Sequence, residues 1–335
     1  MRIVHTAGTF EEEAKQASRE AQNYFGSGEL YLESYLEDPR HIEVQVMADH
    51  HGNTVHLFER ECSIQRRHQK IIEESPSQAL DPHLRERMGE TAIKVMQVSG
   101  YNNAGTVEFL LDKDKKFYFL EVNARLQVEH PVTELISGVD LVHQQIKIAC
   151  GEKLGFAQED LEQKGHAIEC RIYAEDPVNN FLPSSGKVLF LNEPSGPGVR
   201  NDCGIYSGCD VPIYYDPILA KLIVWAESRD QSCQRIIEAL NDYVILGVKT
   251  SIDFLKEVIA HPEFQSGQTT TSFLNKHFKN WKGKDKPQEL EKLALLAASF
   301  DSLNGSFRRA GPSAELKSEY SPWLSLGKWR IGGGR

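Results

Sequence analysis

The 335-residue sequence predicts an α+β fold with an antiparallel β-sheet core flanked by helices. Two observations support this prediction. Apolar and polar residues alternate with a period of two in several segments of strand length, and two pairs of these segments are joined by turn-like connections, as in β-hairpins. Other segments carry apolar residues at helical spacing and lie before, between and after the predicted strands.

The predicted elements follow in chain order. Thr9 starts a capping-box pattern, and helix-forming residues continue from it to about Tyr24. Alternation predicts strands at 29–35, 41–49, 55–60, 103–111 and 117–123, with polar turns at 49–53 and 112–116. Helical spacing predicts helices at 82–98, 138–150, 228–246 and 288–298, while strand character returns at 186–191 and 211–226.

Composition and charge exclude several classes of function. The net charge of −10 and the lack of a basic stripe argue against a nucleic-acid partner. The longest apolar stretches, 188–191 and 222–225, have strand length and fall far short of the roughly 20 residues that a membrane-spanning helix needs. The six cysteines form no CxxC pair, so we expect reduced thiols and no cysteine-bound metal.

The second predicted hairpin is the most informative segment. Its first strand carries one carboxylate, Glu108, and its second strand changes from apolar to polar at Glu121. Alternate residues of a strand share a face, and the predicted shared face holds Phe117, Phe119, Glu121, Asn123 and Arg125. We expect Phe117 and Phe119 to belong to the core, and Glu108 and Glu121 to face each other across the ladder.

Two carboxylates on paired strands repel each other and are costly to bury unless a cation lies between them. Oxygen ligands beside an amide suit Mg²⁺, which commonly takes further ligands from a substrate's phosphates. Ordinary ion pairs with neighbouring lysines or arginines are the alternative interpretation. Five polar residues within nine positions favour a site for nucleotide chemistry: Glu121, Asn123, Arg125, Gln127 and Glu129.

Longer motifs resemble those of biotin carboxylase, the ATP-grasp component of biotin-dependent carboxylases. Residues 121–134, EVNARLQVEHPVTE, are similar to one signature of that family, and residues 61–74, ECSIQRRHQKIIEE, are similar to a second. Shorter matches occur in the same order: YLEDPRHIE at 35–43, GHAIECR at 165–171 and YYDP at 214–217. The resemblance extends from residue 1 to about residue 279.

The resemblance implies the C-terminal part of an ATP-grasp fold and three regions of the chain. Residues 1–35 would be a remnant of the ATP-grasp lid, 36–282 the C-terminal ATP-grasp domain, and 283–335 a linker and the start of a following tail domain. Family members carry an N-terminal nucleotide-fold domain and a glycine-rich loop ahead of the matched part. We therefore expect a portion of a carboxylase subunit, which can be inactive on its own.

The resemblance also implies roles for individual residues. Mg²⁺ or Mn²⁺ would be held by Glu108, Glu121 and Asn123. Bicarbonate would contact Lys70, Arg125, Gln127 and the backbone of Val128, and Glu129 would be the base that takes its proton. Arg171 would stabilise the enolate of biotin, with Asp216 as its orienting partner. ATP would contact Glu33, Leu36, His41, Gln65, His68 and Leu110.

The implied activity is carboxylation of biotin by bicarbonate and MgATP through carboxyphosphate, the first half-reaction of an acyl-CoA carboxylase. The implied partners are a biotin carboxyl carrier domain, a carboxyltransferase subunit, and a second copy in a homodimer. The implied location is the cytoplasm, in preference to a mitochondrial matrix. Two alternatives stay open: another ATP-grasp ligase that activates bicarbonate or a carboxylate, and a non-catalytic dimerisation or scaffold module.

Overall fold

The structure, a computed structural model, describes residues 2–283 and 288–305. The chain divides into two compact units, residues 1–283 and 284–335. The described part of the second unit is one helix, α9 (Gln288–Gly305), which covers the helix predicted at 288–298. Most of the predicted tail region lies outside the described residues, and the division at residues 35 and 282 stays a prediction.

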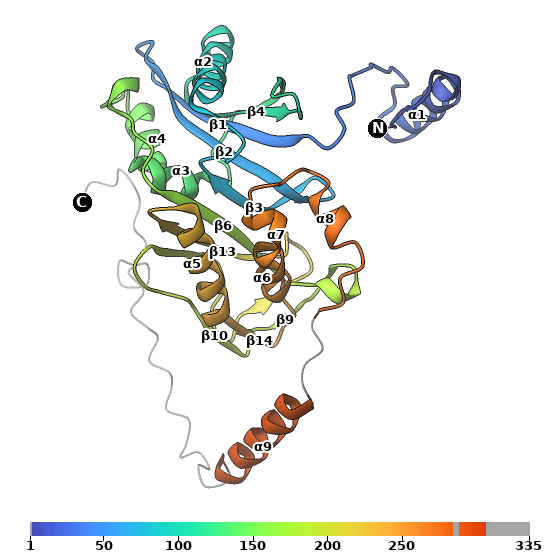
Figure 1. Cartoon of the computed structure of the whole chain (residues 1–335), viewed down its shortest axis with the longest axis vertical. Helices are drawn as coiled ribbons and strands as arrows, with labels where there is room; N and C mark the ends of the chain where they lie inside the picture. The colour runs from blue at the N-terminus through green and yellow to red at the C-terminus, as the bar shows by residue number, and fades with distance from the viewer. Residues whose placement is uncertain (1, 284–287, 306–335) are drawn as a thin grey trace, which may run out of the picture. The chain divides into compact units, whose positions relative to one another are not determined.

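An eight-stranded antiparallel sheet forms the centre of the first unit (Figure 1). Its strands lie in the order β11-β13-β6-β3-β2-β1-β4-β5. Their bounds are β1 (Arg40–Ala48), β2 (Thr54–Arg66), β3 (Gln69–Ser75), β4 (Asn103–Leu111), β5 (Phe117–Asn123), β6 (His166–Tyr173), β11 (Val199–Cys203) and β13 (Ile218–Ala226). Three small ladders pair β7 (Glu175–Asp176) with β8 (Leu182–Pro183), β9 (Gly186–Lys187) with β12 (Asp210–Val211), and β10 (Phe190–Asn192) with β14 (Val244–Leu246).

Helices pack on one face of the sheet, over its central strands. Side chains such as Ile42 of β1 and Ile168 of β6 are completely buried on this face. They pack into two apolar clusters beneath the helices α2 (Pro82–Ser99), α5 (Arg229–Asp242), α6 (Ile252–Ala260), α7 (Pro262–Gln265) and α8 (Phe273–His277). Burying large aliphatic side chains in this way supplies most of the stabilisation of such a fold.

The opposite face of the sheet is only partly apolar. Met47 and Leu57 pack beneath α4 (Leu141–Ala149), and Ala167 and Ile223 pack beneath α3 (His130–Ser137). Between these apolar patches the same face carries charged side chains, because the register pairs Glu43 with Arg60 and Glu73 with Glu169. Several of the predicted site residues, among them Lys70, Glu108 and Arg171, lie in this polar part of the sheet.

The second predicted hairpin is confirmed as β4 and β5, and Glu108 pairs with Glu121 as expected. The predicted shared face of β5 is wrong, because Phe109 pairs with Phe119 and Leu120 is left as a β-bulge between the two pairs. A bulge inserts one residue and shifts the alternation, so Glu121 lies on the face opposite Phe119. Phe119 is 55% exposed and lies outside the core, since β5 is the edge strand.

Other element predictions differ from the structure in identifiable ways. Helix α1 (Phe10–Phe25) is confirmed, but the side chain of Thr9 makes no capping hydrogen bond. No strand forms at 29–35, since an extended segment becomes a strand only when a neighbouring strand pairs with it. The helix predicted at 228–246 ends at Asp242, and its last residues form β14 instead. The sequence prediction missed the helices α3, α6, α7 and α8 and the strands β3, β6 and β11. The described residues also include short 3₁₀ turns at Ala7–Thr9, Gln158–Asp160 and Pro177–Asn179.

Two expectations from composition can be compared with the structure. All six cysteines are free thiols, as predicted. Among the described helices, none has both the length and the apolar character needed to cross a membrane.

Gly165 begins the segment that positions Arg171, and its backbone leaves no room for a side chain. It has φ +68°, and a Cβ atom there would lie 2.3 Å from the carbonyl oxygen of Ala226. We expect Gly165→Ala to lower the free energy of unfolding by about 2–4 kcal/mol, the sum of left-handed strain and overpacking against backbone. Urea denaturation followed by circular dichroism measures this change.

Gly100→Ala is the matched control. Gly100 has φ +64°, but nothing lies within 4 Å of the position that a Cβ atom would take there. An alanine at this position is strained by the left-handed backbone but meets no neighbouring atom. We therefore expect Gly100→Ala to lower the free energy of unfolding by only about 1–2 kcal/mol. Equal losses in the two variants would show that close packing around Gly165 contributes nothing.

Candidate active site

The polar part of the sheet is organised around the ammonium group of Lys70 on β3. Lys70 Nζ donates hydrogen bonds to Glu108 Oε1 at 2.8 Å and to Glu129 Oε1 at 2.7 Å, and it also contacts Glu43 Oε2. The side chain of Lys70 is 12% exposed, and those of the three glutamates are 6% exposed or less. One cation therefore joins carboxylates from β1, from β4 and from the residue before α3.

Arg60 on β2 lies beneath this centre and is completely buried. Its Nε donates to Glu43 Oε1 at 2.6 Å. Its other nitrogens donate to four neutral acceptors, in Gln45, Thr106, Gln127 and Thr133. Sequence reasoning missed both Arg60 and Glu43, although Glu43 closes the 35–43 motif and charged residues inside strongly apolar strands were a usable signal.

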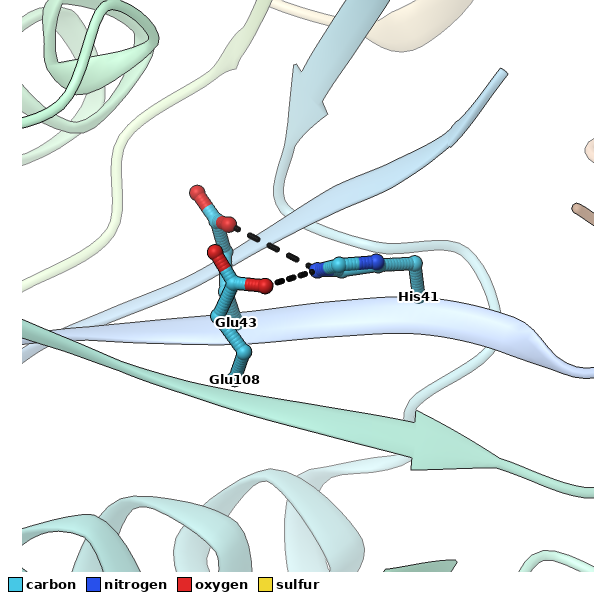
Figure 2. Close-up of side chains that lie close together, drawn as sticks. All are labelled: His41, Glu43 and Glu108. Atoms are coloured by element: carbon cyan, nitrogen blue, oxygen red, sulfur yellow. Dashed lines mark ion pairs between the residues drawn. The ribbon is translucent and has the colours of Figure 1, made fainter. Parts of the chain in front are cut away.

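His41, Glu43 and Glu108 come together at the outer end of this cluster. Figure 2 shows Nε2 of His41 facing both carboxylates, at 2.9 Å from Glu108 Oε2 and 3.8 Å from Glu43 Oε2. One donor atom from each residue lies within 4.8 Å of the others, close enough to share a metal ion. Gln65 Nε2 lies 2.9 Å from Nδ1 of His41 and fixes the orientation of the ring.

The electrostatics keep these carboxylates ionised. Burial alone would raise the pKa of Glu43, but the charges of Lys70 and Arg60 outweigh it and lower that pKa to about 2. Burial would also raise the pKa of Glu108, but interactions with His41 and Lys70 outweigh it and hold that pKa below its usual value. Burial would lower the pKa of Lys70, but the surrounding carboxylates raise it. Ionised oxygen donors of this kind suit a hard divalent cation such as Mg²⁺.

The predicted metal ligands lie together at one edge of the cluster. Asn123 Nδ2 donates to Glu108 Oε1 at 3.0 Å and to Glu121 Oε1 at 3.2 Å. Gln127 Nε2 donates to the same oxygen of Glu108 at 2.8 Å. Glu108 is buried and Glu121 is exposed, so the trio reaches from the buried network to the surface.

Arg171 on β6 is joined to the cluster through Glu129. Its Nη2 donates to Glu129 Oε2 at 3.1 Å, and its Nε donates to Glu73 Oε1 at 2.6 Å. The predicted orienting partner Asp216 is exposed and accepts a hydrogen bond from the Ile218 N–H instead. Glu73 therefore holds the position that we expected Asp216 to fill, because β3 is the neighbour of β6 in the sheet.

The remaining predicted residues lie around this centre with fewer contacts. Arg125 is exposed and donates to Asn123 Oδ1 at 3.3 Å, and the Val128 carbonyl accepts from Lys221 at 2.7 Å. Leu110 pairs with His41 across the β1–β4 ladder. The three others lie apart from the hydrogen-bonded network: Glu33 and Leu36 precede β1, and His68 is exposed in the β2–β3 turn with φ +66°.

The depressed pKa of Glu43 predicts a pH-dependent stability. A glutamate in an unfolded chain has a pKa of about 4.3, so the stabilisation from ionised Glu43 is present above that pH and lost as the pH falls toward 2. We expect the wild-type free energy of unfolding to fall over this window, with about one proton taken up for Glu43 on unfolding. Urea denaturation at a series of pH values measures the slope.

Glu43→Gln removes this titrating group and should flatten the acid slope by about one proton, whatever its effect at neutral pH. Glu238→Gln is the control, because Glu238 is exposed on α5 and its carboxyl meets water in both states. An unchanged slope in Glu43→Gln would contradict the assignment of an ionised Glu43.

Two family descriptions match consecutive parts of the chain. Residues 1–157 match the carbamoyl-phosphate synthase L chain, ATP binding domain, and residues 169–276 match the biotin carboxylase C-terminal domain. Together with the antiparallel sheet and its carboxylate cluster, these matches define an ATP-grasp protein. The chain belongs to the biotin carboxylase family.

Named relatives and solved structures agree with this assignment. The chain is 53% identical over 261 residues to a biotin carboxylase of Halalkalibacterium halodurans, a match that covers 78% of this chain and 58% of the relative. It is 47% identical over 281 residues to the mitochondrial alpha subunit of methylcrotonoyl-CoA carboxylase from Rattus norvegicus, covering 84% of this chain and 39% of the relative. The chain thus spans about two fifths to three fifths of these proteins.

The fold is shared with solved biotin carboxylases. A Campylobacter jejuni biotin carboxylase in complex with β,γ-ATP superposes with a TM-score of 0.79 at 46% identity, covering 83% of this chain and 62% of that one. The biotin carboxylase domain dimer of Hydrogenobacter thermophilus 2-oxoglutarate carboxylase, in complex with MgADP, ADP and bicarbonate, has a TM-score of 0.80 at 44% identity and covers 85% of this chain and 63% of that one.

Proposed function

We propose that this protein catalyses the MgATP-dependent carboxylation of biotin by bicarbonate. The observation that carries the proposal is the hydrogen-bonded chain from Glu108 through Lys70 and Glu129 to Arg171. These hydrogen bonds join, on one face of the sheet, the residues that we propose as a metal ligand, a bicarbonate-orienting cation, a general base and a cation for biotin. Phosphoryl transfer to bicarbonate uses a metal ion and a group that takes the bicarbonate proton, and carboxylation of a neutral ureido group benefits from a cation at the ureido oxygen.

The metal-binding edge would consist of Glu108, Glu121 and Asn123. These residues would hold Mg²⁺, which would supply charge neutralisation at the phosphate oxygens. His41, Gln65 and Leu110 lie on the β1–β2–β4 side, where the nucleotide would bind, with Glu33, Leu36 and His68 as its further contacts. The depressed pKa of Glu108 keeps it ionised for this role across the physiological range.

The next residues act on bicarbonate. Bicarbonate would be oriented by Lys70, Arg125, Gln127 and the backbone of Val128. An ammonium and a guanidinium suit a small planar oxyanion of this kind. A bicarbonate oxygen attacks the γ-phosphorus, ADP leaves, and Glu129 takes the bicarbonate proton. Carboxyphosphate then breaks into carbon dioxide and phosphate, and this phosphate removes the N–H proton of the biotin ureido group.

Arg171 would stabilise the negative charge that develops on the ureido oxygen, before the deprotonated nitrogen attacks carbon dioxide. Asp216 would contact biotin from the 214–217 loop.

In the cell the biotin would be carried by a biotin carboxyl carrier domain, and the carboxyl group would pass to a carboxyltransferase subunit. A homodimer and a cytoplasmic location belong to the same proposal. Its carboxylase context is supported by the similarity to methylcrotonoyl-CoA carboxylase and to a pyruvate carboxylase subunit of Methanothermobacter thermautotrophicus.

The test is ADP release from MgATP and bicarbonate, measured with and without free biotin. We expect biotin to stimulate turnover in the wild type and in Glu238→Ala, whose exposed side chain lies on α5. We expect Glu121→Ala to lose about 10- to 100-fold of this turnover, because it removes one ligand of the metal-binding edge.

The outcomes separate the proposal from its alternatives. Bicarbonate-dependent turnover that biotin does not change would favour another ATP-grasp ligase. No turnover in any of the three proteins, with folding intact, would favour a non-catalytic module. Equal turnover in Glu121→Ala and wild type would remove Glu121 from the metal-binding edge.

A further inference from the structure

Two buried carboxyl groups lie side by side where β3 meets β6. Glu73 and Glu169 are register partners in the ladder, and neither is exposed at all. Cross-strand partners have Cβ atoms about 4.5–5.5 Å apart, so their side chains are direct neighbours. Glu73 Oε1 accepts the hydrogen bond from Arg171 Nε at 2.6 Å, but Oε2 of Glu73 and both oxygens of Glu169 have no hydrogen-bond partner among the described residues.

The cations near this pair are already engaged elsewhere. Lys221 Nζ donates to the Val128 carbonyl at 2.7 Å and lies 3.5 Å from Asp202 Oδ2. Lys70 is shared among three other glutamates. An ionised carboxylate without a partner is costly to bury, and two adjacent carboxylates repel each other, so one of the two is expected to bind a proton instead.

We propose that Glu169 is a neutral carboxylic acid that shares its proton with Glu73, and that this proton-sharing pair positions Arg171. A protonated Glu169 gains a donor, and its register partner Glu73 offers an unpartnered acceptor in Oε2. The pair then carries a single negative charge, which Glu73 presents to Arg171. The effect of this pair on biotin rests on the proposed function. The protonation of Glu169 does not depend on that function.

The surroundings of the pair agree with this assignment. Burial, and then the neighbouring charge of Glu73, raise the pKa of Glu169 well above its usual value. Burial also raises the pKa of Glu73 to about 7, against the opposing effect of Arg171. The charged groups around the two carboxyls are Lys70, Glu129, Arg171 and Lys221, and the neutral titratable groups are Cys62, Cys170 and Tyr173.

Arg171 is thereby held at two points. Glu73 fixes its Nε and Glu129 fixes its Nη2, so the guanidinium plane is set relative to the bicarbonate side of the cluster. A planar guanidinium presents its donors in a rigid fork, so fixing two of them fixes the direction of the others. Glu169 and Glu73 are positioning residues in this scheme, because they act on substrate through Arg171.

Infrared difference spectroscopy on the intact chain tests the proton directly. We expect wild type at about pH 8 to show the C=O stretching band of a protonated carboxylic acid that is missing from Glu169→Gln. Exposed glutamates are ionised at that pH, since their ordinary pKa is about 4.3. The same band in both proteins, or in neither, would overturn the proposal.

Thermal unfolding gives a second readout that does not depend on activity. A carboxyl whose pKa is raised on folding loses stabilisation as the pH rises through its folded pKa, and Gln has no proton to lose. We expect the Tm of Glu169→Gln to equal or exceed that of wild type at about pH 8, with a smaller advantage at about pH 5.

Glu74→Gln is the matched control, because Glu74 is equally buried but ionised between Arg229 and His166. We expect its Tm to fall by several degrees. A comparable fall, or loss of folding, in Glu169→Gln would show that Glu169 is ionised as well and would overturn the proposal.

The positioning role has its own readout. We expect Glu73→Gln to raise KM for free biotin about tenfold with a much smaller change in kcat, because Arg171 stays in the site but loses one of its two fixed points. An unchanged KM for biotin would overturn the positioning role. If the chain has no turnover at all, the proposed function fails, while the infrared and thermal results still decide the protonation.

Discussion

Arg171→Gln is expected to lower biotin-dependent ADP release by about 100- to 1,000-fold, the usual cost of removing one group that stabilises a developing oxyanion. Gln keeps a hydrogen-bond donor at a similar position but lacks the positive charge. The buried carboxylates Glu73 and Glu129 lose their shared partner at the same time. Steady-state kinetics with saturating MgATP and bicarbonate measure the change.

Arg171→Gln should lower ADP release much more in the presence of biotin than in its absence. We expect ADP release in the absence of biotin to fall much less, because Lys70 still joins Glu43, Glu108 and Glu129. Arg200→Gln is the control, since Arg200 on β11 pairs with Glu134 and Asp202 and with none of the carboxylates that Lys70 or Arg171 contacts. An equal loss with and without biotin would mean that Arg171 serves the whole network and has no specific role toward biotin.

Arg60→Leu is expected to lower the free energy of unfolding by about 3–5 kcal/mol, the typical cost of removing one partner from a buried ion pair. Arg60 is completely buried and is the only described side chain that joins Glu43 to both Gln45 and Gln127. Leucine fills part of the space but satisfies none of these acceptors. Urea denaturation monitored by circular dichroism measures the loss.

Arg200→Leu is the comparison for this variant. The Arg200 side chain is 36% exposed, and it also has two acidic partners on the chain. Solvent screens such a pair, so we expect a loss of about 1 kcal/mol or less. Similar losses in the two variants would show that burial of the Arg60 network adds nothing to stability.

Patterns confined to neighbouring residues predicted the local structure well. The polar turn at 112–116 between two alternating segments correctly predicted the β4–β5 hairpin and the pairing of Glu108 with Glu121, because a short turn fixes the register of the strands that it joins. Helices α1 and α2 were predicted nearly to their ends. The motifs at 61–74, 121–134 and 165–171 named residues that the structure brings together around Lys70, although the strands β3 and β6 that carry Lys70 and Arg171 were not predicted.

Features that depend on distant partners were predicted less well. The segment at 29–35 alternates like a strand, yet no strand pairs with it in the described structure. The bulge at Leu120 reverses the face of Phe119 relative to Glu121, and no residue type in the segment indicates a bulge. The extended helix prediction at 228–246 failed because its last residues pair with β10.

The sequence by itself determined which residue types were available for the chemistry: carboxylates beside an amide, two cations and a base at the spacing of the biotin carboxylase motifs. The tertiary structure decided how they are joined. Only the order of the strands in the sheet brings Lys70 against Glu43, Glu108 and Glu129, places Glu73 in the position expected for Asp216, and sets Glu169 beside it. The physical reason is that residue periodicity records which face a side chain occupies, while its partner depends on which distant strand packs alongside.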